Sequence, residues 1–147
     1  MNHFKKEDIQ NHFLVIRLCS DNNYSAINKF QFFFELDPSS LLQSNNYDGK
    51  LPLHFVAKNL STKAFKSVFT YCVLYYPVKK GICLLFTKDN SGRTPFQIVC
   101  DKYECLQVME IVEEILVTHC NNSGNEIRLN IANALLLSCI DDRIHLD

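Results

Sequence analysis

The chain has 147 residues, of which 47% are hydrophobic and 21% charged, and its formal net charge is −1. This length suits a single domain with a sizeable core, and the nearly neutral charge gives no sign of nucleic-acid or membrane binding. No apolar run reaches the roughly 18 residues of a membrane span, and the apolar segment 13–16 lacks a cleavage site after it. We therefore expect no signal peptide and an intracellular protein, cytoplasmic or nuclear.

The first predicted unit is a helix pair over about residues 8–38. Asp8 is placed to cap a helix that continues to about Cys19, and a second helix follows from about Tyr24 to Leu36. Pro38 comes just after this second helix and should end it, because the residue before a proline disfavours helical geometry. The apolar side of the first helix is expected to contain Ile9, Phe13 and Ile16.

The second unit, over about residues 48–77, follows a polar connector at 39–47. Gly49 suits a turn with positive φ, and Pro52 suits a first helical position because the missing N–H has no partner there. We therefore expect a short helix from Pro52 to about Asn59. A second helix should be capped by Ser61, and its apolar positions recur at helical spacing: Phe65, Val68, Phe69, Cys72, Val73 and Tyr76.

The same pattern returns 43 residues later, and this repeat is the main signal in the sequence. The shift pairs Gly49 with Gly92 and Pro52 with Pro95, and apolar residues stay matched without a gap through the second helix. The third unit, about 91–118, should begin with Thr94 as the cap of a helix. A partial fourth unit is expected at 126–147, and an insertion is expected in the connector 78–87.

The opening residues of both units resemble the Thr-Pro-Leu-His start of the ankyrin repeat. One unit keeps Pro-Leu-His at 52–54, and the next has Thr-Pro-Phe-Gln at 94–97. The segments 76–116 and 134–147 are similar to ankyrin-repeat proteins of the kind abundant in diatoms. The resemblance implies an all-α, ankyrin-like solenoid of stacked antiparallel helix pairs with long connectors, in one domain over 1–147. It also implies that His54 is structural and bonds the turn backbone.

The resemblance further implies a protein–protein interaction module without catalytic activity or cofactor, acting as a monomer on another protein whose identity the sequence does not reveal. Ankyrin-type domains hold partners with their turn tips and first helices. We therefore expect partner contacts at Tyr47, Lys50, Lys58, Asn90, Arg93 and Asp101. Stacking should place Lys50 beside Arg93, so that reversing both charges weakens partner capture without lowering the melting temperature.

Charge is unevenly distributed along the chain. Residues 50–93 carry eight Lys and Arg against one acid, whereas residues 94–147 carry three against nine acids. One interpretation is a basic groove for an acidic partner, and the other is mutual neutralisation between neighbouring units or solvation. Tyr75 and Tyr76 next to Lys79 and Lys80 combine aromatic and basic groups, but packing at a helix end is the simpler interpretation.

Seven cysteines and five histidines form no pattern typical of a metal site. The cysteine count is odd and no Cys-x-x-Cys pair occurs, which favours free thiols in a reducing compartment. No Gly-rich phosphate loop and no nucleophile paired with a base is visible, so no catalytic, cofactor or metal residue is predicted. Two alternatives stay open: a truncated structural fragment of a longer repeat array, and an uncharacterised enzyme that uses His54.

Overall fold

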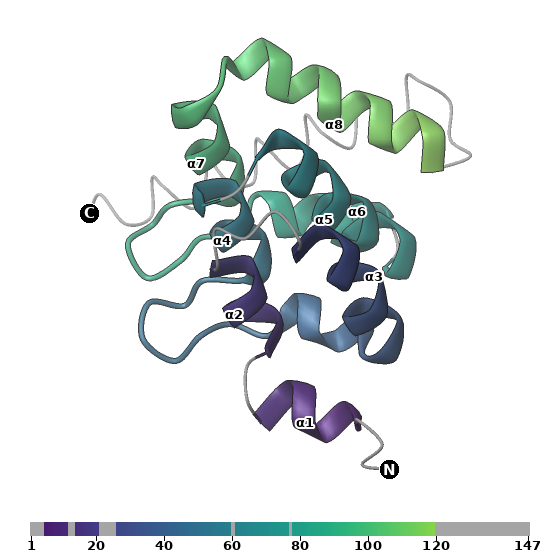
Figure 1. Cartoon of the computed structure of the whole chain (residues 1–147). Coiled ribbons are helices and arrows are strands. Elements are labelled where there is room, and N and C mark those ends of the chain that lie inside the picture. Colours follow the sequence, from purple (N-terminus) through teal and green to yellow (C-terminus); the bar gives the residue numbers. More distant parts are fainter. Residues whose placement is uncertain (1–4, 12–13, 21–25, 60, 77, 120–147) are drawn as a thin grey trace.

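A computed structural model describes residues 5–11, 14–20, 26–59, 61–76 and 78–119 (Figure 1). These ranges are helical, with turns between the helices and no strand. The expected fourth unit at 126–147 lies outside the described residues. The elements are α1 (Lys6–Asn11), α2 (Leu14–Ser20), α3 (Ala26–Leu36), the 3-10 helix η1 (Pro38–Leu42), α4 (Pro52–Asn59), α5 (Thr62–Tyr75), α6 (Val78–Leu85), α7 (Pro95–Lys102) and α8 (Cys105–His119).

The helices form two rows. In one row α4 packs between α2 and α7, and in the other α5 packs between α3 and α8. Contacts within the pairs α2–α3, α4–α5 and α7–α8 join the rows. Helix α4 therefore touches both neighbours in its row as well as its own partner α5, which makes it the most surrounded short helix of the described chain. None of the described helices is long and apolar enough to cross a membrane.

The second and third units begin as the sequence predicts. Helix α4 runs from Pro52 to Asn59, and Ser61 caps α5 by accepting a hydrogen bond from the Ala64 N–H at 3.3 Å. Thr94 caps α7, and its hydroxyl accepts from the Gln97 N–H at 3.1 Å. Each cap satisfies a backbone donor that a helix end would otherwise leave open.

The predicted start of the first unit was wrong. Helix α1 already begins at Lys6, and Asp8 lies inside it, where its Oδ2 accepts from the Lys5 N–H at 2.8 Å. A side chain at the third helical position can accept a hydrogen bond from the backbone N–H of the residue before the helix. Asp8 therefore stabilises a helix that begins two residues before it. The described parts of the range 8–19 are helical, in α1 and α2, and Ile9 and Ile16 are buried as predicted. Phe13 lies outside the described residues.

Both predicted connectors contain helices. Pro38 ends α3 but also begins η1, because its fixed φ suits a first helical position, and Ser40 and Leu41 of η1 are buried. The segment 78–87 is mostly the helix α6, which packs on α5 and touches α7. The longer spacing between units two and three therefore holds an additional amphipathic helix rather than an irregular insertion, and its buried residues are Ile82, Leu84 and Leu85.

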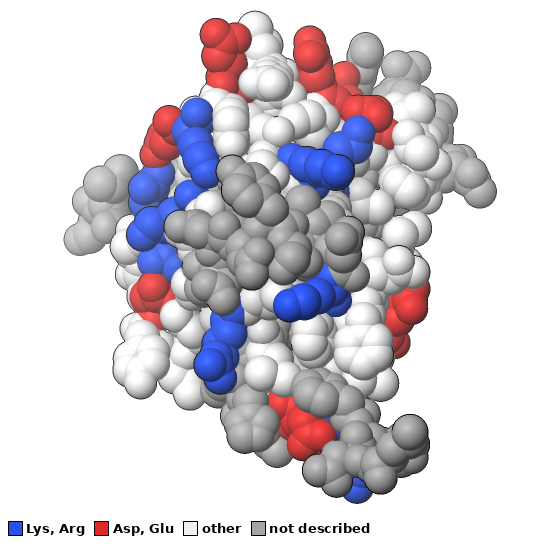
Figure 2. Space-filling view, in the orientation of Figure 1, with Lys and Arg blue, Asp and Glu red and all other residues white. Residues whose placement is uncertain are grey.

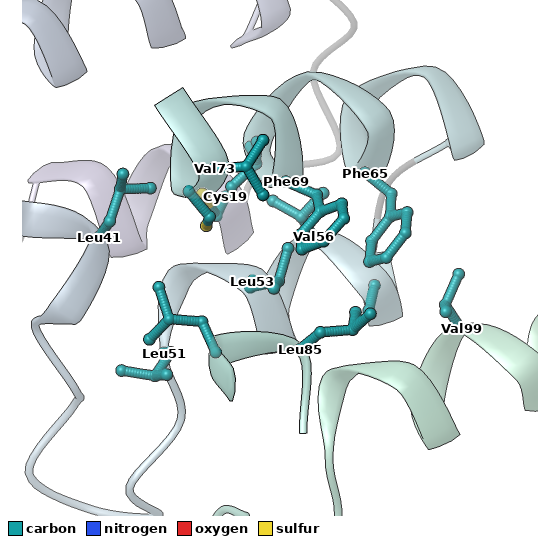
Figure 3. Packing of buried hydrophobic residues seen from close by; sticks show 14 of the residues in the cluster. Cys19, Leu41, Leu51, Leu53, Val56, Phe65, Phe69, Val73, Leu85 and Val99 are labelled. Carbon is teal, nitrogen blue, oxygen red and sulfur yellow. The ribbon is translucent and has the colours of Figure 1, made fainter. Parts of the chain in front are cut away.

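The core lies between the two rows and under α6. Leu53 and Val56 of α4 point toward the same interior as Phe65 and Phe69 of α5, and Leu85 of α6 lies close to them (Figure 3). All five side chains are at most 2% exposed. Burying one such side chain contributes about 1.5–3 kcal/mol, so this junction is a main source of stability. The stripe predicted for α5 is confirmed through residue 73.

Tyr76 ends the stripe half-buried at the boundary of α5. Its hydroxyl donates to the Pro38 carbonyl at 2.9 Å, and the Lys80 ammonium lies 4.9 Å from the ring centroid. Tyr76 and Lys80 therefore pack the end of α5 against η1, in agreement with the simpler of the two interpretations of this aromatic and basic cluster. Lys80 adds a cation–π contact of about 0.5–1 kcal/mol at such an exposed site.

Gly81 lets α6 approach α5 closely. A Cβ at this position would lie 2.9 Å from the Cys72 carbonyl oxygen and 3.1 Å from the Val73 Cα. In an open helix, Gly→Ala stabilises by roughly 1 kcal/mol. Here we expect Gly81→Ala to lower the free energy of unfolding by about 1–3 kcal/mol, because backbone atoms must move apart. Urea unfolding of the two chains measures this difference, and a more stable variant would contradict the close packing.

Candidate functional site

The turn before α4 is built around Asn45. The Asn45 N–H donates to the Lys50 carbonyl at 3.0 Å, which closes a loop over residues 45–50. The Asn45 Oδ1 accepts from the N–H groups of Asp48 and Lys50, at 3.2 and 3.1 Å. Gly49 has a φ of 68°, a left-handed conformation that favours glycine. One amide side chain therefore satisfies the inner donors of the whole turn.

The turn before α7 has the same plan with Asp89 at its base. The Asp89 N–H donates to the Arg93 carbonyl at 2.9 Å, and Asp89 Oδ1 accepts from the N–H groups of Ser91 and Arg93, each at 2.9 Å. Gly92 has a φ of 79°. This turn spans residues 89–93 and is one residue shorter than the first. The 43-residue register therefore holds from Gly49 onward. Asn45 and Asp89 have the same role but are 44 residues apart, so this register does not align them.

The two turns lie against one another through their backbones. The Asn90 N–H donates to the Asp48 carbonyl at 2.8 Å, and the Asn90 side-chain amide donates to the Tyr47 carbonyl at 3.4 Å. Both loops project to the left side of the molecule in Figure 1. Tyr47 is 92% exposed at the tip of the first turn. The two turns thus present one continuous edge to solvent.

His54 ties these turns to the helix rows. Its Nδ1 accepts from the buried Leu51 N–H at 3.0 Å, so the ring proton is on Nε2, which donates to the Arg93 carbonyl at 3.1 Å. The prediction that His54 bonds the turn backbone is confirmed. Burial lowers the pKa of His54, although the Arg93 carbonyl and the charge of Asp89 partly oppose this. The ring is therefore held neutral between two units.

Gln97 occupies the position equivalent to His54 in the third unit, and it makes one of the two hydrogen bonds that His54 makes. Its Oε1 accepts from the Thr94 N–H at 3.0 Å, as the His54 ring accepts from the Leu51 N–H. Together with the Thr94 hydroxyl, this completes a capping box at the start of α7. A histidine or a glutamine at the third helical position therefore satisfies the same backbone donor in each unit.

A groove of about 420 Å³ lies where α4, α7 and the second turn meet. Ala57 and Ile98 contribute apolar side chains to it, and charged side chains supply most of the rest. The complete lining is Lys50, Ala57, Lys58, Asp89, Ser91, Arg93, Ile98, Asp101 and Lys102. In Figure 2, several Lys and Arg side chains lie along the left of the view, the side on which the two turns project, and others lie across its centre.

The groove contains four of the six residues predicted to contact a partner, namely Lys50, Lys58, Arg93 and Asp101. Tyr47 and Asn90 lie apart from it, at the tips of the two turns. Lys50 and Arg93 line the same hollow, as the stacking of units predicts. Sequence reasoning missed Lys102, which follows Lys58 by 44 residues on the next first helix, a spacing one residue off the repeat.

The carboxylates of the groove are already engaged within the protein. Asp101 pairs with Arg93, and the Asp89 Oδ1 holds the second turn. Burial alone would raise the pKa of Asp89, but hydrogen bonds from Ser91 and Arg93 outweigh it and keep this pKa below its ordinary value. The Asp89 Oδ2 accepts no hydrogen bond within the described chain and lies 3.9 Å from the Lys50 Nζ. Positive charge therefore remains in excess.

The lysines differ in how they are used. Lys50 lies 2.6 Å from an Asp48 carboxylate oxygen as well as near Asp89, so it bridges the two turns. Lys66 pairs with Glu114 at 2.7 Å between α5 and α8, which fits mutual neutralisation of neighbouring units at that place. Lys58, by contrast, is exposed and forms no ion pair with any acid of the described ranges. The groove therefore keeps at least one cation for an external group.

Within the part of the chain that the structure describes, no group of three or more His, Cys, Asp or Glu side chains is placed to hold a metal ion. Comparison with known proteins gives no match, whether to family models, to curated proteins or to solved structures. The comparisons therefore assign no ligand or partner to the groove.

Asp89→Asn and Asp89→Ala separate the turn-holding role of this side chain from its charge. Asparagine does the same work at position 45, so we expect Asp89→Asn to change the free energy of unfolding by less than about 1 kcal/mol. Asp89→Ala leaves the inner N–H groups of the turn without an acceptor and should cost about 1–3 kcal/mol. Chemical denaturation of both variants checks this, and equal losses would contradict the assigned role.

Acid should weaken the protein through His54. Because the pKa of His54 is lowered by folding, the unfolded chain binds the proton more readily, and stability is lost as pH falls below the ordinary value of about 6.5. His54→Gln keeps an acceptor for Leu51 but cannot titrate. We expect it to cost about 1 kcal/mol at pH 7 and to flatten the decline in unfolding free energy between pH 7 and 5. Parallel declines in both chains would refute this.

Proposed function

We propose that this chain is a protein-interaction module with an ankyrin-like arrangement of helix pairs, and that its groove binds an acidic segment of another protein. The single observation that carries the proposal is the excess of positive charge in a groove shared by two equivalent units. Its lining holds four basic side chains, Lys50, Lys58, Arg93 and Lys102, against two acidic ones, Asp89 and Asp101. Lys50 and Arg93 are paired with acids of the protein, whereas Lys58 forms no ion pair with an acid of the described residues. A partner that supplies carboxylates would complete this charge pattern.

The repeated helix pairs support the ankyrin-like part of the proposal. The helices pack in two rows, the pairs α4–α5 and α7–α8 are each preceded by a Gly turn, and a backbone hydrogen bond joins these two turns. Repeats that contact only their neighbours create an extended surface along one edge, which is the usual binding surface of such proteins. The groove lies on this edge, between the first helices of units two and three.

The groove also has a rigid frame suited to recognition. The turn that borders it is fixed by Asp89 and by the His54 contact with Arg93, so little ordering is needed when a partner arrives. Ala57 and Ile98 provide apolar area beneath the charged rim. Its volume falls in the range of about 300–1,000 Å³ that accommodates a small ligand or a few side chains. A short acidic segment with one apolar residue fits these features.

A non-catalytic role is supported by the bonding of His54. Both of its ring nitrogens are occupied by backbone groups, Leu51 and Arg93, and the ring is buried. A general base needs a nitrogen directed at substrate or nucleophile. An intracellular, reducing location is supported by Cys19 and Cys72, which are free thiols buried in the core, where they behave as small hydrophobes.

Lys58→Glu and Lys63→Glu form a matched pair to test the groove. Both lysines are exposed, but Lys58 lines the groove and Lys63 lies on α5 outside its lining. With a terminally labelled deca-glutamate peptide at low ionic strength, we expect Lys58→Glu to raise the Kd about fivefold or more and Lys63→Glu to change it little. Fluorescence anisotropy measures both. Equal effects would show attraction to overall charge and would contradict a groove.

The Lys50 and Arg93 reversal suggested by the sequence is a poorer test. Lys50→Glu would place a carboxylate near Asp48 and the buried Asp89, and Arg93→Glu would face Asp101. Like charges in such positions destabilise the turns themselves. We therefore expect this double reversal to lower the melting temperature, so that loss of binding by it would not separate recognition from folding.

A further inference from the structure

Two cysteines meet at the corner where α7 turns into α8. The Cys100 Sγ lies 3.2 Å from the Cys105 Sγ, and its S–H donates toward the Cys105 sulfur. Cys100 lies in the last turn of α7, and Cys105 is the first residue of α8. Between them, the Tyr103 N–H donates to the Val99 carbonyl at 2.9 Å and fixes the end of α7. The backbone of this corner thus holds the two sulfurs together.

The other described cysteines provide a contrast within the same molecule. Cys19 and Cys72 are buried in the core, where burial raises the pKa of both thiols, that of Cys72 to about 12. Neither is accessible to a reagent in solution. Cys83 is exposed on α6, but it has no sulfur contact within the described ranges. Cys105 is exposed and Cys100 is partly so, which leaves this pair both accessible and adjacent.

We propose that Cys100 and Cys105 form a reactive dithiol that a low-molecular-weight disulfide, such as oxidised glutathione, converts to an internal disulfide. This site is independent of the groove and of the function proposed for it. Disulfide sulfurs are about 2.05 Å apart, so the observed pair needs to close by roughly 1 Å. Side-chain rotation at an exposed corner can supply such a movement without rearranging the core.

The reaction proceeds by two thiol–disulfide exchanges. The Cys105 thiol gives its proton to water, and its sulfur attacks one sulfur of the small disulfide, releasing one thiolate and leaving a mixed disulfide on Cys105. The Cys100 sulfur, after losing its own proton, then attacks the Cys105 sulfur and releases the second thiolate. The two protein thiols are oxidised, one small disulfide is reduced, and the two released thiolates take up the two protons.

The order of attack follows from exposure and protonation. Burial raises the pKa of Cys100 to about 12, and its hydrogen bond to Cys105 and the charges of Cys105 and Asp101 add to the effect. Cys100 is therefore protonated and poorly nucleophilic in the reduced protein, while Cys105 is the more exposed of the two. Cys105 meets the reagent first, and Cys100 resolves the mixed disulfide from the other side.

The experiment uses the full chain, reduced and then incubated with increasing oxidised glutathione. After alkylation of remaining thiols, combined cleavage at Lys, Arg and Glu places Cys100 in the peptide 94–102 and Cys105 in 105–110, apart from every other cysteine. We expect these two peptides to be joined by a disulfide, while Cys83 carries glutathione. Mass spectrometry without reduction distinguishes the two products.

The variants Cys100→Ser and Cys83→Ser complete the test. Without Cys100, the mixed disulfide on Cys105 has no resolving thiol, so glutathione should accumulate there at least tenfold above its level in the parent chain. Cys83→Ser should leave the joined peptides unchanged. The proposal is overturned if Cys105 of the parent chain retains glutathione to the same extent as Cys83, or if Cys105 pairs instead with another cysteine. Circular dichroism confirms that each variant is folded.

Discussion

The junction between the second and third units depends on one neutral imidazole. His54 starts its own helix by accepting from Leu51, and it reaches across to the carbonyl of Arg93 in the following turn. Both contacts require the same tautomer, with the proton on Nε2, and the ring itself is fully buried. Around this ring, α4 packs on α7, and Asn90 of the second Gly turn donates hydrogen bonds to backbone carbonyls of the first. The groove exists because these elements are held at a fixed spacing.

The turns show how different side chains produce one backbone shape. Asn45 and Asp89 each satisfy the inner donors of a turn, but only Asp89 brings a negative charge under the groove. The Asp89 carboxylate lies 3.9 Å from the Lys50 Nζ, and the Asp48 carboxylate lies nearer, at 2.6 Å. The change from amide to carboxylate between equivalent turns therefore places a second acid beside Lys50.

Local sequence signals predicted much of the region between residues 49 and 118. Pro52, Ser61 and Thr94 mark helix starts because each acts on backbone groups within three residues along the chain. The stripe on α5 was equally clear, since its spacing alone defines a buried face. The prediction that Asp8 precedes the helix was wrong, because a carboxylate can accept a backbone hydrogen bond from the third helical position as well as from the position before the first.

Other features depend on packing that no local pattern reveals. Residues 78–87 were predicted to be a connector from repeat spacing alone, whereas α6 is stabilised by its close approach to α5 at Gly81. The meeting of Cys100 with Cys105 depends on how α7 turns into α8, which sequence periodicity does not give. Four of the six predicted contact residues share the groove, because repeat register places equivalent positions side by side.

Units two and three differ at the equivalent position that is His54 in the former and Gln97 in the latter. The Gln97 amide oxygen accepts from the Thr94 N–H and completes its own capping box, but within the described residues Gln97 makes no hydrogen bond to another unit, as His54 does. The two units are therefore not interchangeable building blocks. Exchanging their order in the chain would leave the new boundary without the side chain that spans it, even though every helix kept its own residues.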